Sequence, residues 1–193
     1  MITKLKTYRI NLWKTKISLT FEKTKRYYKA RGKTGEMTQA ISALQVAKYF
    51  IYKANCDGDL ITNLKMQKLL YYAQAWYLVN FSKALFKDPI MAWRFGPIVE
   101  SVYHDFKKFK YSPIKCENAE KAVETIPVDK KQYLDEYYKI YISYSAFDLT
   151  QMSHNEGPWR DTPQSKEISI KTIQNFYKEQ YRKQVEKKAK KTT

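Results

Sequence analysis

The stretch Lys65-Met66-Gln67-Lys68-Leu69-Leu70-Tyr71-Tyr72-Ala73-Gln74-Ala75-Trp76 decides the fold. Its apolar side chains recur at the spacing of an α-helix, and they cover a wider face than a surface helix needs. Thr62 or Asn63 suits the cap position at its start. The pattern predicts a helix over residues 64–81 at the centre of the protein.

The residues that follow this helix predict a short strand and then a second helix. Residues 90–95 have the composition of a strand, and Gly96-Pro97 interrupts it. Proline is well tolerated in the first turn of a helix, so a helix over 97–109 is expected. Residues 65–105 are therefore predicted to form two packed helices that meet at Trp93-Arg94-Phe95-Gly96-Pro97.

Three further helices are expected from periodicity and caps. One follows Thr38 and ends at the turn cluster 55–59, one spans 129–145 with Asp129 and Gln132 as a capping box, and one begins at Ile170 after Ser169. Glycine and proline number only 5 and 6, which argues against a sheet-rich fold. We predict a mainly α protein, a single compact helical domain of about five to six helices with at most a short strand pair.

Positive charge is concentrated at the two ends of the 193-residue chain. The net charge is +17, of which residues 1–36 carry +9 and residues 178–193 carry +5. We expect a basic extension over 1–36, a domain over 37–177 and a basic helical tail over 178–193. Met37 is interpreted as the natural start, and the alternative is a basic arm that folds on a partner.

No feature of the sequence predicts export or membrane insertion. Lys and Arg interrupt every short apolar run near the start, and no segment approaches the roughly 20 apolar residues of a membrane span. The two cysteines, Cys56 and Cys116, are 60 residues apart. We expect a soluble cytoplasmic protein with reduced thiols and no membrane partner.

The chain offers few groups for catalysis or metal binding. His104, His154, Cys56 and Cys116 show no metal-ligand spacing, and Gly-rich phosphate loops and nucleophile elbows are absent from the sequence. We predict no enzyme activity, no metal and no cofactor. His154 has two readings, a polar contact at a recognition surface or a structural residue that ties residues 155–159 to the core.

Aromatic residues are unusually frequent, with 17 Tyr, 9 Phe and 4 Trp. Tyr137, Tyr138, Tyr141 and Tyr144 exceed what one buried stripe of the 129–145 helix is expected to hold. Part of that helix is therefore predicted to be an exposed contact surface. Tyr and Trp are also the residue types that dominate protein interfaces.

Three blocks of this sequence resemble the Panacea domain, also called SocA-like or GepA-like. They are residues 65–76, the block Ala92-Trp93-Arg94-Phe95-Gly96-Pro97-Ile98-Val99-Glu100-Ser101-Val102-Tyr103, and the block 149–159 with Ser153-His154-Asn155-Glu156-Gly157-Pro158-Trp159. The blocks occur in the family's order, within residues 40 to 180. The departures are Met66 for Leu, Phe95 for Tyr and Ser153 for Thr.

The resemblance implies a mostly helical antitoxin that neutralises a cognate toxin, encoded adjacently, by direct binding. It implies no catalytic residues. Two alternatives stay open, a proteolytic adaptor that delivers a toxin to a protease, and a prophage regulator that binds nucleic acid weakly through its basic ends. The residues expected to form the shared scaffold or the partner-binding surface are Tyr72, Trp76, Trp93, Phe95, Gly96, Pro97, Tyr103, His154, Pro158 and Trp159.

Overall fold

A computed structural model describes residues 39–190. The expectations for residues 1–36, for Met37 as a start and for Thr38 as a cap lie outside the described residues. Thr38–Phe176 forms one compact unit, and the chain from Tyr177 onward belongs to a second. The domain boundaries drawn from charge stay a prediction.

The described residues are mainly helical, as predicted, with one pair of strands. Eight α-helices occur between residues 39 and 190, more than expected, because three short helices add to those that periodicity predicts. In chain order the elements are α2 (Ala43–Asp57), α3 (Asn63–Phe81), β1 (Ile90–Trp93), β2 (Gly96–Val99), α4 (Glu100–Phe106), the 3-10 helix η1 (Lys107–Phe109), α5 (Ala119–Glu124), α6 (Val128–Tyr141), α7 (Ala146–His154), α8 (Gly157–Arg160) and α9 (Ile170–Ala189).

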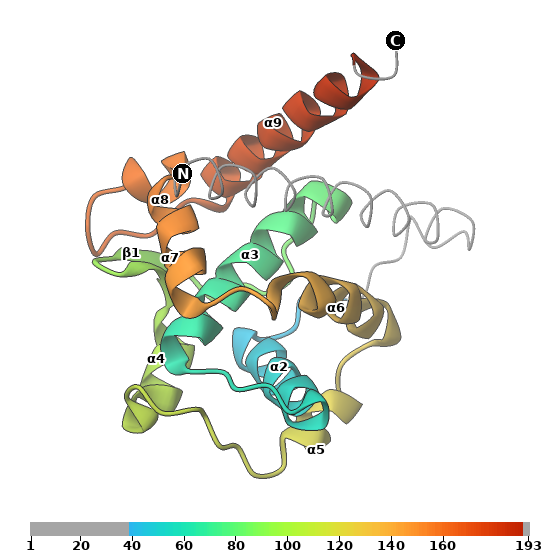
Figure 1. Cartoon of the computed structure of the whole chain (residues 1–193), viewed down its shortest axis with the longest axis vertical. Helices are drawn as coiled ribbons and strands as arrows, with labels where there is room; N and C mark the ends of the chain where they lie inside the picture. Colours follow the sequence, from blue (N-terminus) through green and yellow to red (C-terminus); the bar gives the residue numbers. More distant parts are fainter. Residues whose placement is uncertain (1–38, 191–193) are drawn as a thin grey trace, which may run out of the picture. The chain divides into compact units, whose positions relative to one another are not determined.

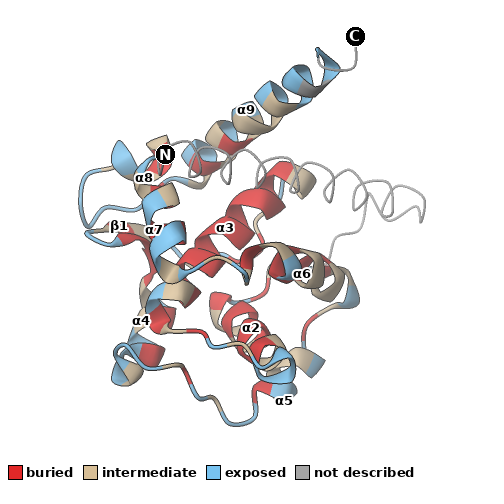
Figure 2. Ribbon diagram, viewed as in Figure 1, coloured by how far each residue is buried: buried red, intermediate tan, exposed pale blue. Residues whose placement is uncertain are grey.

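Helix α3 runs through the middle of the 38–176 unit (Figure 1), and the prediction of a central helix is confirmed. Every residue from Met66 to Val79 is buried (Figure 2). Thr62 caps the start by accepting a hydrogen bond from the Lys65 N–H, and Ser82 ends the helix in the left-handed region. A helix that is apolar nearly all round belongs in a core.

Helix α2 begins later than the sequence pattern indicates. Ser42 caps it: its hydroxyl accepts from the Gln45 N–H, while the Gln45 side chain accepts from the Ser42 N–H. These two bonds satisfy donors that the first turn leaves free. Gly58, with φ 74°, ends the helix and confirms the predicted turn.

The prediction of a helix starting at Pro97 is wrong. Residues Gly96–Val99 form β2, which pairs antiparallel with β1 in the register Ile90↔Val99 to Trp93↔Gly96. The other edge of β1 is covered by the segment before α9, where Ala92 and Ile90 exchange backbone hydrogen bonds with residues 165–168. Pro97 lacks an N–H and fits an edge strand as well as a helix start, so only these long-range bonds decide between the two.

The prediction of an exposed tyrosine surface on α6 is also wrong. Tyr137, Tyr138 and Tyr141 are 0–1% exposed, and Tyr144 is half-buried. The Tyr137 hydroxyl donates to the Leu69 carbonyl at 2.8 Å, and the Tyr133 hydroxyl donates to the Ala73 carbonyl at 2.7 Å. The hydrogen-bonded tips allow these rings to be buried against α3, which is why more of them fit than an apolar stripe would hold.

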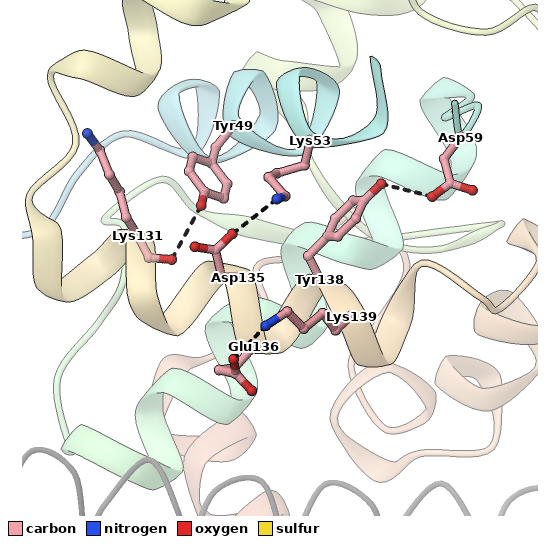
Figure 3. Close-up of polar contacts among 8 residues, drawn as sticks. All are labelled: Tyr49, Lys53, Asp59, Lys131, Asp135, Glu136, Tyr138 and Lys139. Atoms are coloured by element: carbon pink, nitrogen blue, oxygen red, sulfur yellow. Dashed lines mark hydrogen bonds and ion pairs between the residues drawn. The ribbon is translucent and has the colours of Figure 1, made fainter. Parts of the chain in front are cut away.

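Helix α6 also makes polar contacts with α2 and with the turn that follows α2 (Figure 3). Asp135 lies 3.5 Å from the Lys53 ammonium, the Tyr49 hydroxyl donates to the Lys131 carbonyl, and the Tyr138 hydroxyl donates to the Asp59 carboxylate at 3.1 Å. The expected capping box at Asp129 does not form, because Pro127 occupies the cap position and makes no side-chain cap bond.

One amide side chain makes three hydrogen bonds to the loop after α3. Gln74 donates to the Phe86 carbonyl at 2.8 Å and accepts from the Leu85 N–H at 2.8 Å and the Phe86 N–H at 3.3 Å. All three residues are buried. The loop therefore depends on Gln74 for the pairing of three buried backbone groups.

We expect Gln74→Met to lower the free energy of unfolding by about 3 kcal/mol or more, since methionine leaves three buried backbone groups without a partner. The measurement is chemical denaturation followed by circular dichroism. Gln151→Met, at an exposed position on α7, is the matched control and should stay within about 0.5 kcal/mol of the wild type. Equal stabilities of the two variants would contradict this account.

Candidate functional site at the β-hairpin

Three segments that are far apart in the sequence meet around the β1–β2 hairpin. Helix α3 contacts β2 and α7, and α7 contacts β2 and α8. Each segment contains one of the three sequence blocks described above. Their residues therefore form one neighbourhood rather than three separate surfaces.

Polar side chains on the first turns of α3 hold β2 and α4 in place. The Val99 N–H donates to the Gln67 side chain at 2.9 Å, and the Gln67 amide donates to Asn63 at 3.0 Å. The Asn63 amide in turn donates to the Tyr103 carbonyl at 3.1 Å. This chain of bonds fixes the end of the hairpin and the first turn of α4 relative to the central helix.

Lys68 is fully buried beneath the hairpin. Its ammonium group donates to the Pro97 carbonyl at 3.0 Å, and none of the ion pairs found within residues 39–190 includes it. Desolvation by burial lowers the pKa of Lys68 to about 7. Near neutral pH the amine is therefore close to half-protonated, which is unusual for a lysine.

Gly96 is where Lys68 comes closest to the hairpin backbone. A Cβ at this position would lie 2.6 Å from the Lys68 Nζ and 2.9 Å from the Ser153 Oγ. Gly96 also has φ 99°, a conformation that side-chain-bearing residues rarely adopt. The glycine is thus required both by the backbone and by the two side chains packed against it.

His154 and Trp159 form a stacked pair against the hairpin. Their ring centroids are 3.9 Å apart with an angle of 8° between the planes, and the Trp159 indole N–H donates to the Trp93 carbonyl at 2.9 Å. Burial lowers the pKa of His154 and the nearby Lys68 charge lowers it further, while a hydrogen bond with the Phe95 backbone acts in the opposite direction. These contacts are those expected if His154 ties the 155–159 turn to the hairpin.

The ten residues singled out from the sequence fall into four groups. Tyr72 and Trp76 lie in the core on α3, where burial holds the pKa of Tyr72 well above its ordinary value. Gly96, Pro97 and Pro158 are buried under the hairpin and at α8, and the rings of Trp93, Tyr103, His154 and Trp159 are half-buried around it. Phe95 differs from all of these, because its side chain is 64% exposed.

The polar part of the site, which consists of Asn63, Gln67, Lys68 and Ser153, was not predicted from the sequence. All four are at most 4% exposed. A signal existed: Asn63 and Gln67 lie one turn apart on one face of the helix, and Lys68 follows Gln67 directly before a long run of mostly apolar residues. Buried polar residues at that spacing indicate partners elsewhere in the fold.

The described residues contain no grouping typical of a metal centre. Within residues 39–190, no three His, Cys, Asp or Glu side chains gather so that they could hold a metal ion. Cys56 is exposed and Cys116 half-buried, and both are free thiols. None of the helices in this part of the chain combines the length and apolar character that a membrane crossing requires.

The residues that match a known protein family include those that meet around the hairpin. Residues 66–160 match the family model "Antitoxin SocA-like, Panacea domain". This chain carries a SocA-like Panacea domain. The matched residues begin in α3 and end in α8, so they include the hairpin and every contact of its residues with α7 and α8 described above.

A curated relative of the Panacea domain is "Antitoxin SocA" from Caulobacter vibrioides (strain NA1000 / CB15N). It is 38% identical over 68 residues, which cover 35% of this chain and 36% of the relative. The matched stretch thus spans about a third of that protein's length. No solved structure matches the chain.

We expect Gly96→Ala to destabilise the Panacea domain by about 2–4 kcal/mol, from backbone strain and from displacement of Lys68 and Ser153. Gly58→Ala is the matched control, because Gly58 has φ 74° but a Cβ added there would meet nothing within 4 Å. Denaturant titration compares the two. A larger loss at Gly58 than at Gly96 would refute the packing argument.

Stability of the Panacea domain should rise with pH because of Lys68. The folded-state pKa is about 7, below the ordinary value of 10.5. Between these values the unfolded chain binds a proton that the folded chain lacks, so the free energy of unfolding increases by up to about 1.4 kcal/mol per pH unit. Below pH 7 both states are protonated and this contribution is constant.

Lys68→Met should remove this increase. Subtracting the unfolding free energy of the variant from that of the wild type, at about pH 7 to pH 9.5, isolates the Lys68 contribution from those of Lys65 and Lys130, whose pKa values are also lowered by burial. A difference that stays flat over this interval would show that Lys68 remains charged in the folded protein.

Proposed function

We propose that this protein is an antitoxin that binds a cognate toxin directly and so neutralises it, acting in the cytoplasm as a binding protein and not as an enzyme. The observation that carries the proposal is the match of residues 66–160 to the SocA-like antitoxin model, together with a relative that is itself named an antitoxin. Toxin and antitoxin are expected to be encoded side by side.

The closed interior of the domain supports a binding role. The two polar side chains that pack against Gly96, Lys68 and Ser153, are 0% exposed. A substrate could not reach them without opening the hairpin, whereas catalysis requires reacting groups within hydrogen-bond reach of the substrate. Their bonds hold backbone segments, which suits a rigid frame for protein recognition.

The charge distribution favours a protein partner over nucleic acid. Residues 37–177 carry a net charge of only +3, against +9 and +5 in the two ends. A nucleic-acid-binding domain is expected to carry a basic stripe on its own surface. Contacts made by the basic ends alone would be weak and sensitive to salt.

The test is co-expression of this protein with the product of each neighbouring open reading frame under separate inducible promoters. We expect one neighbour to arrest growth alone, and growth to be restored when this protein is present. The purified pair should form a complex with a dissociation constant on the order of 1–100 nM. A chain truncated before Asn63, which lacks the matched domain, is the negative control.

Measuring the abundance of the toxin in rescued cells distinguishes two mechanisms of neutralisation, direct binding and delivery to a protease. Unchanged toxin abundance in rescued cells indicates occlusion by binding, while a fall that depends on a cellular protease indicates delivery for degradation. If no neighbouring product is toxic, or if the toxic product neither binds nor is neutralised, the antitoxin proposal is wrong.

A further inference from the structure

The turn of the β-hairpin carries an exposed aromatic ring that folding does not require. Arg94 and Phe95 connect Trp93 to Gly96, and neither has a positive φ. Gly96, with φ 99°, supplies the left-handed residue that such a turn needs. The turn geometry therefore sets no demand for an aromatic residue at position 95, yet the phenylalanine is 64% exposed.

The exposed ring stands on a rigid support. The Trp93 ring lies 5.1 Å from the Tyr103 ring in an edge-on arrangement and 6.5 Å from the His104 ring. The Trp93 carbonyl is held by the Trp159 indole, and the Tyr103 carbonyl is held by Asn63. The hairpin that carries Phe95 is therefore held in place on both sides of the turn, so little backbone freedom is lost when a partner covers the ring, which is the property of an interface anchor.

One positive side chain lies beside the ring, and two more follow at the end of α4. The Arg94 guanidinium lies 5.6 Å from the centre of the Phe95 ring. Lys107 and Lys108 follow Tyr103 and His104 by one helical turn and are exposed. None of the ion pairs found within residues 39–190 involves these three cations. Asp105 is the exposed acid among them.

We infer that this turn face, made of Trp93, Arg94, Phe95, Tyr103, Lys107 and Lys108, docks an acidic segment of the toxin that also presents an apolar pocket or side chain to Phe95. The inference rests on the proposed antitoxin function and adds to it the contact surface and the chemistry of the partner. Carboxylates on the partner would pair with Arg94 and the two lysines, and Phe95 would be buried at the centre.

Charge complementarity selects the acidic partner. Arg94 lies beside the exposed ring, and Lys107 and Lys108 lie one helical turn beyond the Tyr103 and His104 rings that Trp93 contacts. These three cations form no ion pair with the described residues, so they would repel a basic segment and attract one rich in Asp and Glu. Arginine next to an aromatic ring is a frequent composition at interface centres. Phe147 on α7 is exposed to a similar degree, 62%, but is followed by an acid, Asp148, so it offers a control with the opposite electrostatic setting.

Direct mapping tests the face without knowledge of the toxin. The probe is a synthetic peptide of alternating glutamate and leucine, titrated into the isotope-labelled full-length chain and followed through backbone amide resonances. We expect the shifts to concentrate at residues 93–96 and 103–108, and to weaken at least about fivefold in Phe95→Ala. Shifts elsewhere or none would overturn the inference, as would tighter binding of a single-stranded oligonucleotide to the same amides.

The toxin identified by co-expression provides the second arm. Phe95→Ala should weaken toxin binding about tenfold or more, and Phe95→Tyr should retain it. Arg94→Glu combined with Lys107→Glu should slow association, with the largest effect at low salt. The matched controls Phe147→Ala and Lys171→Glu should bind as the wild type does.

The two arms separate the two proposals. If the wild type neutralises no neighbour but the peptide maps to the turn face, the antitoxin proposal fails and the face stands as an acidic-peptide site. If the wild type neutralises a toxin and Phe95→Ala binds it equally well, the antitoxin proposal stands and the turn face is wrong. Thermal unfolding of each variant should match the wild type, since the substituted side chains are exposed.

Discussion

The structure depends on the need to pair polar groups on a helix that is buried along its length. Helix α3 carries Gln67, Lys68 and Gln74 into the interior, and each is 0–1% exposed. An unpaired buried polar group costs about 1–3 kcal/mol, so each must bond to something inside the fold. The partners are backbone atoms of β2 and of the loop at residues 85–86. Helix α3 therefore positions its neighbours by directional bonds as well as by apolar contact.

The buried hydroxyls of Tyr133 and Tyr137 on α6 must likewise find hydrogen-bond partners inside the fold, and they find them on α3. Tyr133 and Tyr137 present their rings to the core and donate their hydroxyls to carbonyls of α3. Phenylalanine would provide the same ring area but would not fix the register of one helix against the other. Tyr133 and Tyr137 thus provide directional packing between α6 and α3, and the buried tyrosines of α6 do not form an adhesive surface. The tyrosine hydroxyls and the α3 amides together hold the central helix on two sides.

Local signals in the sequence were sufficient for the central helix, the Gly58 turn and the start of α9, because each depends on residues within a few positions of one another. The hairpin could not be predicted in this way. Pro97 suits a helix start and an edge strand equally, and the choice depends on Gln67, Lys68 and the 165–168 segment, which are remote in sequence. The burial of Tyr137 and Tyr141 depends on α3 in the same way. The site was predictable in its aromatic and Gly-Pro residues, whereas its polar residues were hidden in an apolar helix.

The buried residues that hold the hairpin in place, which are the frame of the domain, differ in role from the exposed residues of its turn. Desolvation offsets much of what the bond from Lys68 to Pro97 contributes, so the lysine is better understood as fixing the position of the hairpin than as stabilising the fold. This packing restricts position 96 to glycine, because any side chain there would clash with Lys68 and Ser153. Pro97 is fixed beside it through the bond from Lys68 to its carbonyl. Arg94 and Phe95 are exposed to solvent beside it. Substitutions at these two positions should therefore change the surface of the turn while the frame below it is preserved.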